Sequence, residues 1–328
     1  MDLLKLIKEK YEFYPNTTAS EGISSVVSHI EIAEKHYENA KKGDEYLFND
    51  VIYRSNQAFE GALKEAYRTI AGKDPNKVTP HKIEKYFEEN SVLKERTLHL
   101  FTNYRTEWRN KSTHDYKLYF SEQEALLAIV NISAFINILL DQMAEKQAYE
   151  LETNELENTA VTESNTATER PLIDRIVELL RAFSENVPSK MKGVAIPNIT
   201  EAALIGYLTA YIKTLASDIE FSTNYIIGLE TGLKYETDIF LQKGQDKLVI
   251  EIKNPLRGVT HSIPNGRKQI ENYLIASRIP NGILYIPPRF TGEKMAVDVK
   301  TIESGGSQYS VTLIYPESRF INQAMDDS

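Results

Sequence analysis

The sequence has no cysteine among its 328 residues, which excludes disulfide frameworks, thiolate metal sites and cysteine nucleophiles. It also lacks an excess of positive charge. The formal net charge is −9 at pH 7, which argues against a protein that coats polyanions generally. A nucleic-acid enzyme is still compatible with this charge if basic side chains gather locally or a divalent metal is bound.

Long apolar runs are also missing from the sequence. The first residues, MDLLKLIKEKYEF, carry charge within five positions and lack the apolar core of a signal peptide. We expect no membrane-spanning segment, because such a helix needs about 20 consecutive, mostly apolar residues. Together with the absence of cysteine, this predicts a cytoplasmic protein without membrane contact.

One segment, residues 151–169, differs in composition from the rest of the chain. It reads LETNELENTAVTESNTATE, with five glutamates, no basic residue and no periodic apolar pattern. This composition predicts an acidic flexible linker. The length of the chain fits two domains, which we expect at 1–150 and 170–328.

The N-terminal half has the pattern of a helical bundle. Apolar residues of segment 45–71 recur at close to helical spacing, at Leu47, Val51, Phe59, Leu63 and Tyr67. Ser121 and Glu124 form a capping-box pattern ahead of a long apolar helix. No convincing strand precedes residue 190, so this half is expected to be helical.

The C-terminal half changes character after two expected helices at 171–183 and 200–216, the second with Thr200 as its expected cap. Short apolar runs with turn signals follow, and one helix at 266–278 interrupts them. Helices, strands, a helix and further strands in this order predict an α/β domain. The whole chain is therefore expected to be α followed by α/β.

The stretch LVIEIKN, residues 248–254, places charge inside an apparently buried strand. Side chains alternate along a strand, so Glu251 and Lys253 share the face opposite to Ile250. Asp238 lies 13 positions before Glu251, and a hairpin turn at Gly244 brings the two together. Two carboxylates and a strand carbonyl suit Mg²⁺ or Mn²⁺, and a lysine beside them can orient water. An ordinary solvated strand face is the alternative interpretation.

This pattern resembles the core of the PD-(D/E)xK nuclease superfamily: Asp238, then twelve intervening residues, then Glu251-Ile252-Lys253. Thr237 stands where the family name has proline. The resemblance implies a restriction-endonuclease-like mixed sheet flanked by helices, with Mg²⁺ or Mn²⁺ held by Asp238 and Glu251.

Two neighbouring helices extend the resemblance to the PD-(D/E)xK superfamily. Glu201 opens the helix at 200–216, where the superfamily often carries a glutamate that assists metal binding. Gln269 and Tyr273 match the Gln-x-x-x-Tyr helix of RecB-like members. The resemblance thus adds Glu201 to the metal ligands and Gln269 and Tyr273 to the site, and it covers about 185–290.

The stretch WRNKSTHDY, residues 108–116, carries a second candidate site, with Trp108 expected in the core. Arg109 and His114 are five residues apart, about 140° around a regular helix. The polar residues between them are expected to break the helix and bring His114 back toward Arg109. The pair resembles the R-x4–6-H motif of HEPN domains, over about 25–145.

The HEPN resemblance implies a helical bundle that pairs as a homodimer. It also implies metal-independent RNA cleavage, with His114 transferring a proton and Arg109 holding the phosphate. The alternative is an arginine and a histidine that cap a helix end.

The two resemblances together predict a metal-dependent nuclease that hydrolyses phosphodiester bonds, with DNA favoured as substrate. The N-terminal domain would dimerise and could cut RNA. Both families are frequent in antiviral defence systems. The resemblance therefore implies a defence effector that binds nucleic acid and a partner protein of the same defence system. The alternative is a catalytically inactive nucleic-acid-binding or adaptor protein that keeps both folds.

Overall fold

The computed structural model describes residues 2–12, 18–114, 119–158, 170–190, 199–228, 234–254, 262–288 and 293–317. The chain divides into two compact units, Met1–Gln147 and Ala148–Ser328. The coarse prediction of a helical part followed by an α/β part is confirmed.

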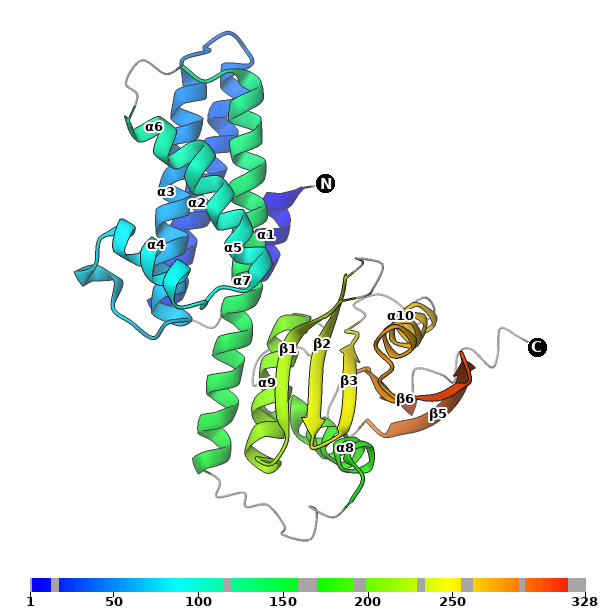
Figure 1. Ribbon diagram of the computed structural model, residues 1–328. Helices are drawn as coiled ribbons and strands as arrows, with labels where there is room; N and C mark the ends of the chain where they lie inside the picture. Colours follow the sequence, from blue (N-terminus) through cyan, green and yellow to red (C-terminus); the bar gives the residue numbers. More distant parts are fainter. Residues whose placement is uncertain are drawn as a thin grey trace. The chain divides into compact units, whose positions relative to one another are not determined.

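The first unit is built from helices. They are α1 (Leu3–Glu12), α2 (Thr18–Ala40), α3 (Leu47–Thr69), η1 (Pro75–Lys77), α4 (Pro80–Glu89), α5 (Glu95–Tyr104), the π-helical turn η2 (Arg105–Arg109), α6 (Asn110–His114) and α7 (Glu122–Asn158), whose residues from Ala148 onward belong to the second unit. Figure 1 shows α2, α3 and α7 running beside one another. The described part of this unit contains no strand, as predicted.

The core of the first unit follows from the helical spacing of its apolar residues. Val51, Phe59 and Leu63 of α3 are all fully buried. Phe59 stacks on Phe101 at 5.7 Å between ring centroids and contacts Phe135 of α7 at 5.6 Å. Trp108 is also buried here, as predicted.

Helix α7 begins at the predicted capping box and runs further than expected. The backbone N–H of Ser121 donates to Glu124 Oε2 at 2.9 Å, and the backbone N–H of Glu124 donates back to Ser121 Oγ at 3.3 Å. The helix then continues to Asn158, so the first eight residues of the predicted linker are helical. The flexible-linker prediction is wrong there because Leu156 packs into the core of the second unit. Residues 159–169 lie outside the described residues.

The same helix corrects the expectation about membrane-spanning segments. By length and composition alone, α7 is apolar enough to cross a membrane, and no other helix in the described ranges is. Within the fold, 56% of its apolar window is buried.

The second unit is a six-stranded mixed sheet covered by helices on both faces (Figure 1). Its elements are α8 (Leu172–Lys190), α9 (Glu201–Leu215), β1 (Glu220–Gly228), β2 (Lys234–Lys243), β3 (Asp246–Ile252), α10 (Ser262–Ser277), β4 (Asn281–Tyr285), β5 (Met295–Ser304) and β6 (Ser307–Pro316). The strand order is β1-β2-β3-β4-β6-β5. Strands β3, β4 and β6 are parallel, and the remaining pairs are antiparallel.

Strand β3 is buried on both faces, which explains its apolar sequence. Leu248, Ile250 and Ile252 pack in one cluster with α8 and α9. Val249 packs in another cluster with α10. The predicted alternation of side chains is therefore confirmed, and so is the turn at Gly244, which has a φ of +59°.

Candidate active site

The β2–β3 hairpin places Asp238 and Glu251 side by side. The paired register of β2 and β3 runs from the turn to Ile239, which faces Ile250. Asp238 and Glu251 are one residue further from the turn on their strands. Facing residues of antiparallel strands share a face. Asp238 Oδ2 also accepts a hydrogen bond of 2.7 Å from the backbone N–H of Ile252, which fixes its carboxylate beside Glu251.

Glu251 is buried together with an ion-pair partner, Lys253. Glu251 is only 2% exposed, and its Oε1 lies 2.7 Å from the Nζ of Lys253. Its other oxygen, Oε2, is buried and has no hydrogen-bond partner within the described ranges. A buried carboxylate oxygen without a partner is costly, and a bound cation would satisfy it.

The pKa values of the three groups show how tightly their charges interact. Burial and the negative charge of Glu251 raise the pKa of Asp238 to about 8. Burial also raises the pKa of Glu251, against the opposing effect of Lys253. Burial lowers the pKa of Lys253. The negative charges of Glu251, Glu201 and Asp238 have a larger opposite effect, so the pKa of Lys253 is above its ordinary value. The protein therefore holds two adjacent carboxyls that resist ionisation unless a positive charge joins them.

Glu201 lies at the edge of this cluster, at the start of α9. Thr200 caps α9 as predicted, since its Oγ1 accepts from the backbone N–H of Ala203 at 3.1 Å. Glu201 Oε1 accepts from the backbone N–H of Asn254 at 3.1 Å. Its charge reaches Asp238, Glu251 and Lys253 and influences the pKa of each.

Asn254 is a site residue that the sequence did not reveal. Its side-chain amide donates to the backbone carbonyl of Ile199 at 2.6 Å, while its backbone N–H binds Glu201. It thereby ties the start of α9 to the end of β3. Its position directly after Lys253 was the only signal in the sequence.

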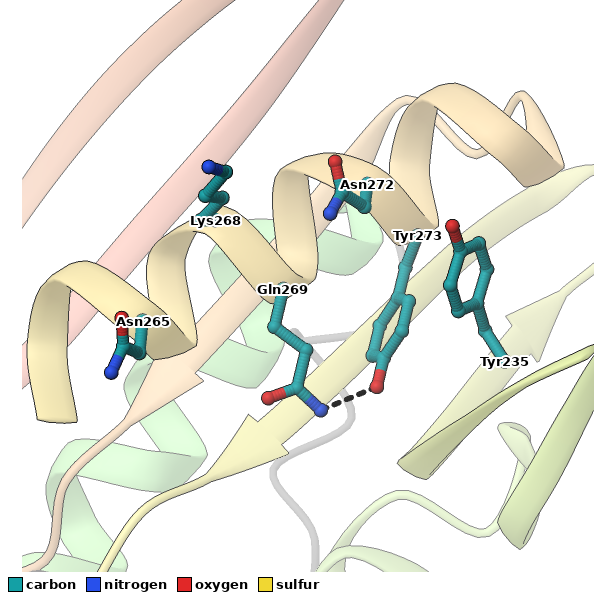
Figure 2. A pocket seen from close by; sticks show the side chains of 6 residues that line it. All are labelled: Tyr235, Asn265, Lys268, Gln269, Asn272 and Tyr273. Atoms are coloured by element: carbon teal, nitrogen blue, oxygen red, sulfur yellow. Dashed lines mark hydrogen bonds between the residues drawn. The ribbon is translucent and has the colours of Figure 1, made fainter.

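Gln269 and Tyr273 of α10 form a hydrogen-bonded pair that braces strand β2. Figure 2 shows the Gln269 amide pointing at the Tyr273 hydroxyl, to which it donates a hydrogen bond. Tyr273 in turn donates to the backbone carbonyl of Glu236 at 2.9 Å. Burial raises the pKa of Tyr273, and Glu251 and Asp238 raise it further.

A divalent cation fits the chemistry of Asp238 and Glu251. Both are carboxylates, the ligands that Mg²⁺ and Mn²⁺ prefer, and Glu251 Oε2 has no other partner among the described residues. Within the described ranges, no three histidine, aspartate or glutamate side chains converge as a metal-ligand group. Two carboxylates would hold such a cation, with water and phosphate oxygens as the remaining ligands, as is usual for Mg²⁺.

No protein-family model, curated protein or solved structure matches this chain.

The second candidate pair, Arg109 and His114, is arranged differently from the prediction. Arg109 ends the π-helical turn η2, and α6 continues as helix to His114. The expected helix break is therefore wrong. Ser112 Oγ donates to the backbone carbonyl of Arg109 at 3.1 Å and accepts from Asn56 at 2.7 Å, so it is satisfied without leaving the helix. The side chain of His114 lies outside the described residues.

Arg109 lies among carboxylates. Its guanidinium is 4.0 Å from Glu60 and 3.8 Å from Glu84, and it donates to Asn110 Oδ1 at 3.0 Å. Glu84 is 2% exposed, and burial raises its pKa despite the nearby arginine. Two acidic neighbours reduce the attraction of Arg109 for a phosphate.

Proposed function

We propose that this protein is a metal-dependent nuclease that hydrolyses phosphodiester bonds, with DNA as the favoured substrate. The observation that carries the proposal is the pair of adjacent carboxyls, half-buried Asp238 and buried Glu251, with Lys253 ion-paired to Glu251. A carboxylate pair on two neighbouring strands, with a lysine beside it, suits phosphoryl chemistry, which needs charge neutralisation and a positioned water.

Each residue of the site would have a separate role in hydrolysis. Asp238 and Glu251 would hold Mg²⁺ or Mn²⁺, which when bound polarises a phosphate oxygen and lowers the pKa of water. When the cation binds Glu251, the ion pair between Glu251 and Lys253 would break. The Lys253 ammonium would then orient the attacking water or stabilise the negative charge that develops on the phosphate. Glu201 would orient a water at the edge of the site.

The arrangement supports membership in the PD-(D/E)xK superfamily. A glutamate at the start of α9, a hairpin carrying Asp238 and Glu251, and the Gln-x-x-x-Tyr pair on α10 occur in the order that the resemblance requires. The mixed sheet with helices on both faces is compatible with a restriction-endonuclease-like fold. An antiviral effector in the cytoplasm is the setting that we propose by analogy alone.

For the N-terminal unit we propose a HEPN-like domain that forms a homodimer. Three apolar residues of α7 lie on one helical face with more than two fifths of their surface exposed, namely Leu126, Leu127 and Val130. Such a face is typical of an interface. RNA cleavage by Arg109 and His114 is the second candidate function. The π-helical turn that ends at Arg109 favours it, because π-turns are frequent at functional sites.

Cleavage assays on labelled single-stranded DNA, duplex DNA and RNA test the nuclease proposal. We expect DNA cleavage with Mg²⁺ or Mn²⁺ that is abolished by EDTA and by Lys253→Ala. Lys247→Ala is the matched control, because Lys247 is exposed near the other end of β3. DNA cleavage that survives both EDTA and Lys253→Ala would refute the assignment.

A further inference from the structure

One face of α10 lines an open pocket beside the carboxylate site. The pocket is lined by Tyr235, Asn265, Lys268, Gln269, Asn272 and Tyr273. The five α10 residues recur at intervals of three and four, so they form one stripe along the helix (Figure 2). Tyr235 of β2 closes one end, with its ring centroid 5.3 Å from that of Tyr273.

The pocket adjoins the proposed reaction centre. Tyr273 is near enough to Asp238, Glu251 and Lys253 for their charges to affect its pKa. A Cβ added at Gly266 would lie 3.4 Å from Lys253 Cγ, so α10 also packs on the stem of that lysine. A substrate whose phosphate reached the carboxylates would therefore pass the pocket.

The lining has the chemistry of a nucleotide subsite. Asn265, Lys268 and Asn272 are exposed, and none makes a hydrogen bond or ion pair with another residue of the described ranges. Amide side chains can form hydrogen bonds with base edges, and a lysine can form an ion pair with a phosphate. Tyr235 is half-buried, so part of its ring is left as a surface on which a base can stack.

We infer that this pocket binds an unpaired nucleotide of the substrate, next to the phosphate that is cut. An aromatic ring and base-reading amides act on a base that has left the duplex. A duplex-binding face would need several cations to follow the backbone, whereas Lys268 is the one cationic residue in the lining. The inference rests on the proposed nuclease function, and it predicts that single-stranded DNA is preferred over duplex DNA.

Binding measured without cleavage tests the inference separately from catalysis. Fluorescence anisotropy in EDTA would compare a short labelled single strand of mixed sequence with its duplex, using the full chain. We expect the wild type to bind the single strand more tightly. Tyr235→Leu and Asn272→Ala should each weaken single-strand binding about tenfold and leave duplex binding unchanged.

Matched variants keep the result interpretable. Asn272 is exposed, so Asn272→Ala is informative even if Tyr235→Leu disturbs folding. Lys268→Gln should weaken binding, and Lys247→Gln, the same charge change at an exposed site near the β2–β3 turn, should not.

Unchanged affinity in both Asn272→Ala and Lys268→Gln would overturn the inference, as would equal losses in Lys268→Gln and Lys247→Gln. Loss of single-strand affinity in the pocket variants, together with no cleavage by the wild type in any metal, would support the subsite and reject the nuclease.

Discussion

Replacing Asp238 by asparagine should make the metal-free protein more stable at alkaline pH. Burial and the charge of Glu251 raise the pKa of Asp238 from its ordinary 3.8 to about 8 in the folded protein. A carboxyl with a raised folded pKa binds its proton more tightly when folded. The free energy of unfolding therefore falls as pH rises between these two values, and the whole penalty is present above about pH 8. An asparagine amide carries no such penalty.

The size of the effect follows from the pKa of Asp238. One pKa unit corresponds to about 1.4 kcal/mol, so a rise of about four units would amount to about 6 kcal/mol. Asp238 is only half-buried and shares protons with Glu251, so screening by solvent reduces the figure, and we expect about 3 kcal/mol. The asparagine oxygen can still accept the hydrogen bond from Ile252.

Urea unfolding in EDTA, at about pH 5 and about pH 9, measures this difference. The wild type should lose about 2 kcal/mol more between the two conditions than Asp238→Asn does, because part of the penalty is already present at pH 5. Asp246→Asn is the control, because Asp246 is an exposed carboxylate at the start of the neighbouring strand β3. Identical pH dependence in the wild type and Asp238→Asn would contradict the buried carboxylate pair.

Three further changes test other parts of the structure. Asn254→Ala should weaken Mn²⁺ binding about tenfold, because the start of α9 loses the side-chain hydrogen bond to Ile199 that holds it beside β3, and calorimetry would measure it. His114→Ala should remove any RNA cleavage that persists in EDTA and leave metal-dependent DNA cleavage unchanged, as a gel assay would show. Leu127→Glu should convert a dimer to a monomer in light scattering, whereas Leu151→Glu, at another exposed leucine of α7, should not. A monomeric wild type would contradict the proposed interface.

Local patterns in the sequence predicted much of the second unit. The alternation of side chains along 248–253 predicted the two faces of β3. Gly244 predicted the turn that brings Asp238 beside Glu251. Thr200 gave the start of α9. These features depend on neighbouring residues, which is why a sequence reveals them.

Features that depend on distant contacts were not predicted. Acidic composition suggested a linker from residue 151, but burial of Leu156 in the second core keeps α7 helical to Asn158. Polar residues suggested a break after Arg109, but Asn56 of another helix binds Ser112 and the helix continues. Asn254 could be recognised only once the start of α9 was found beside it.

The central claim is that Asp238 and Glu251 hold a divalent cation, and calorimetric titration with Mn²⁺ tests it most directly. We expect that the wild type binds Mn²⁺ and that Asp238→Ala does not, while circular dichroism shows the variant folded. We also expect tighter binding as pH rises toward about 8, since the proton on Asp238 competes with the metal. A folded wild type that binds no Mn²⁺ at that pH would contradict the claim and favour a non-catalytic adaptor.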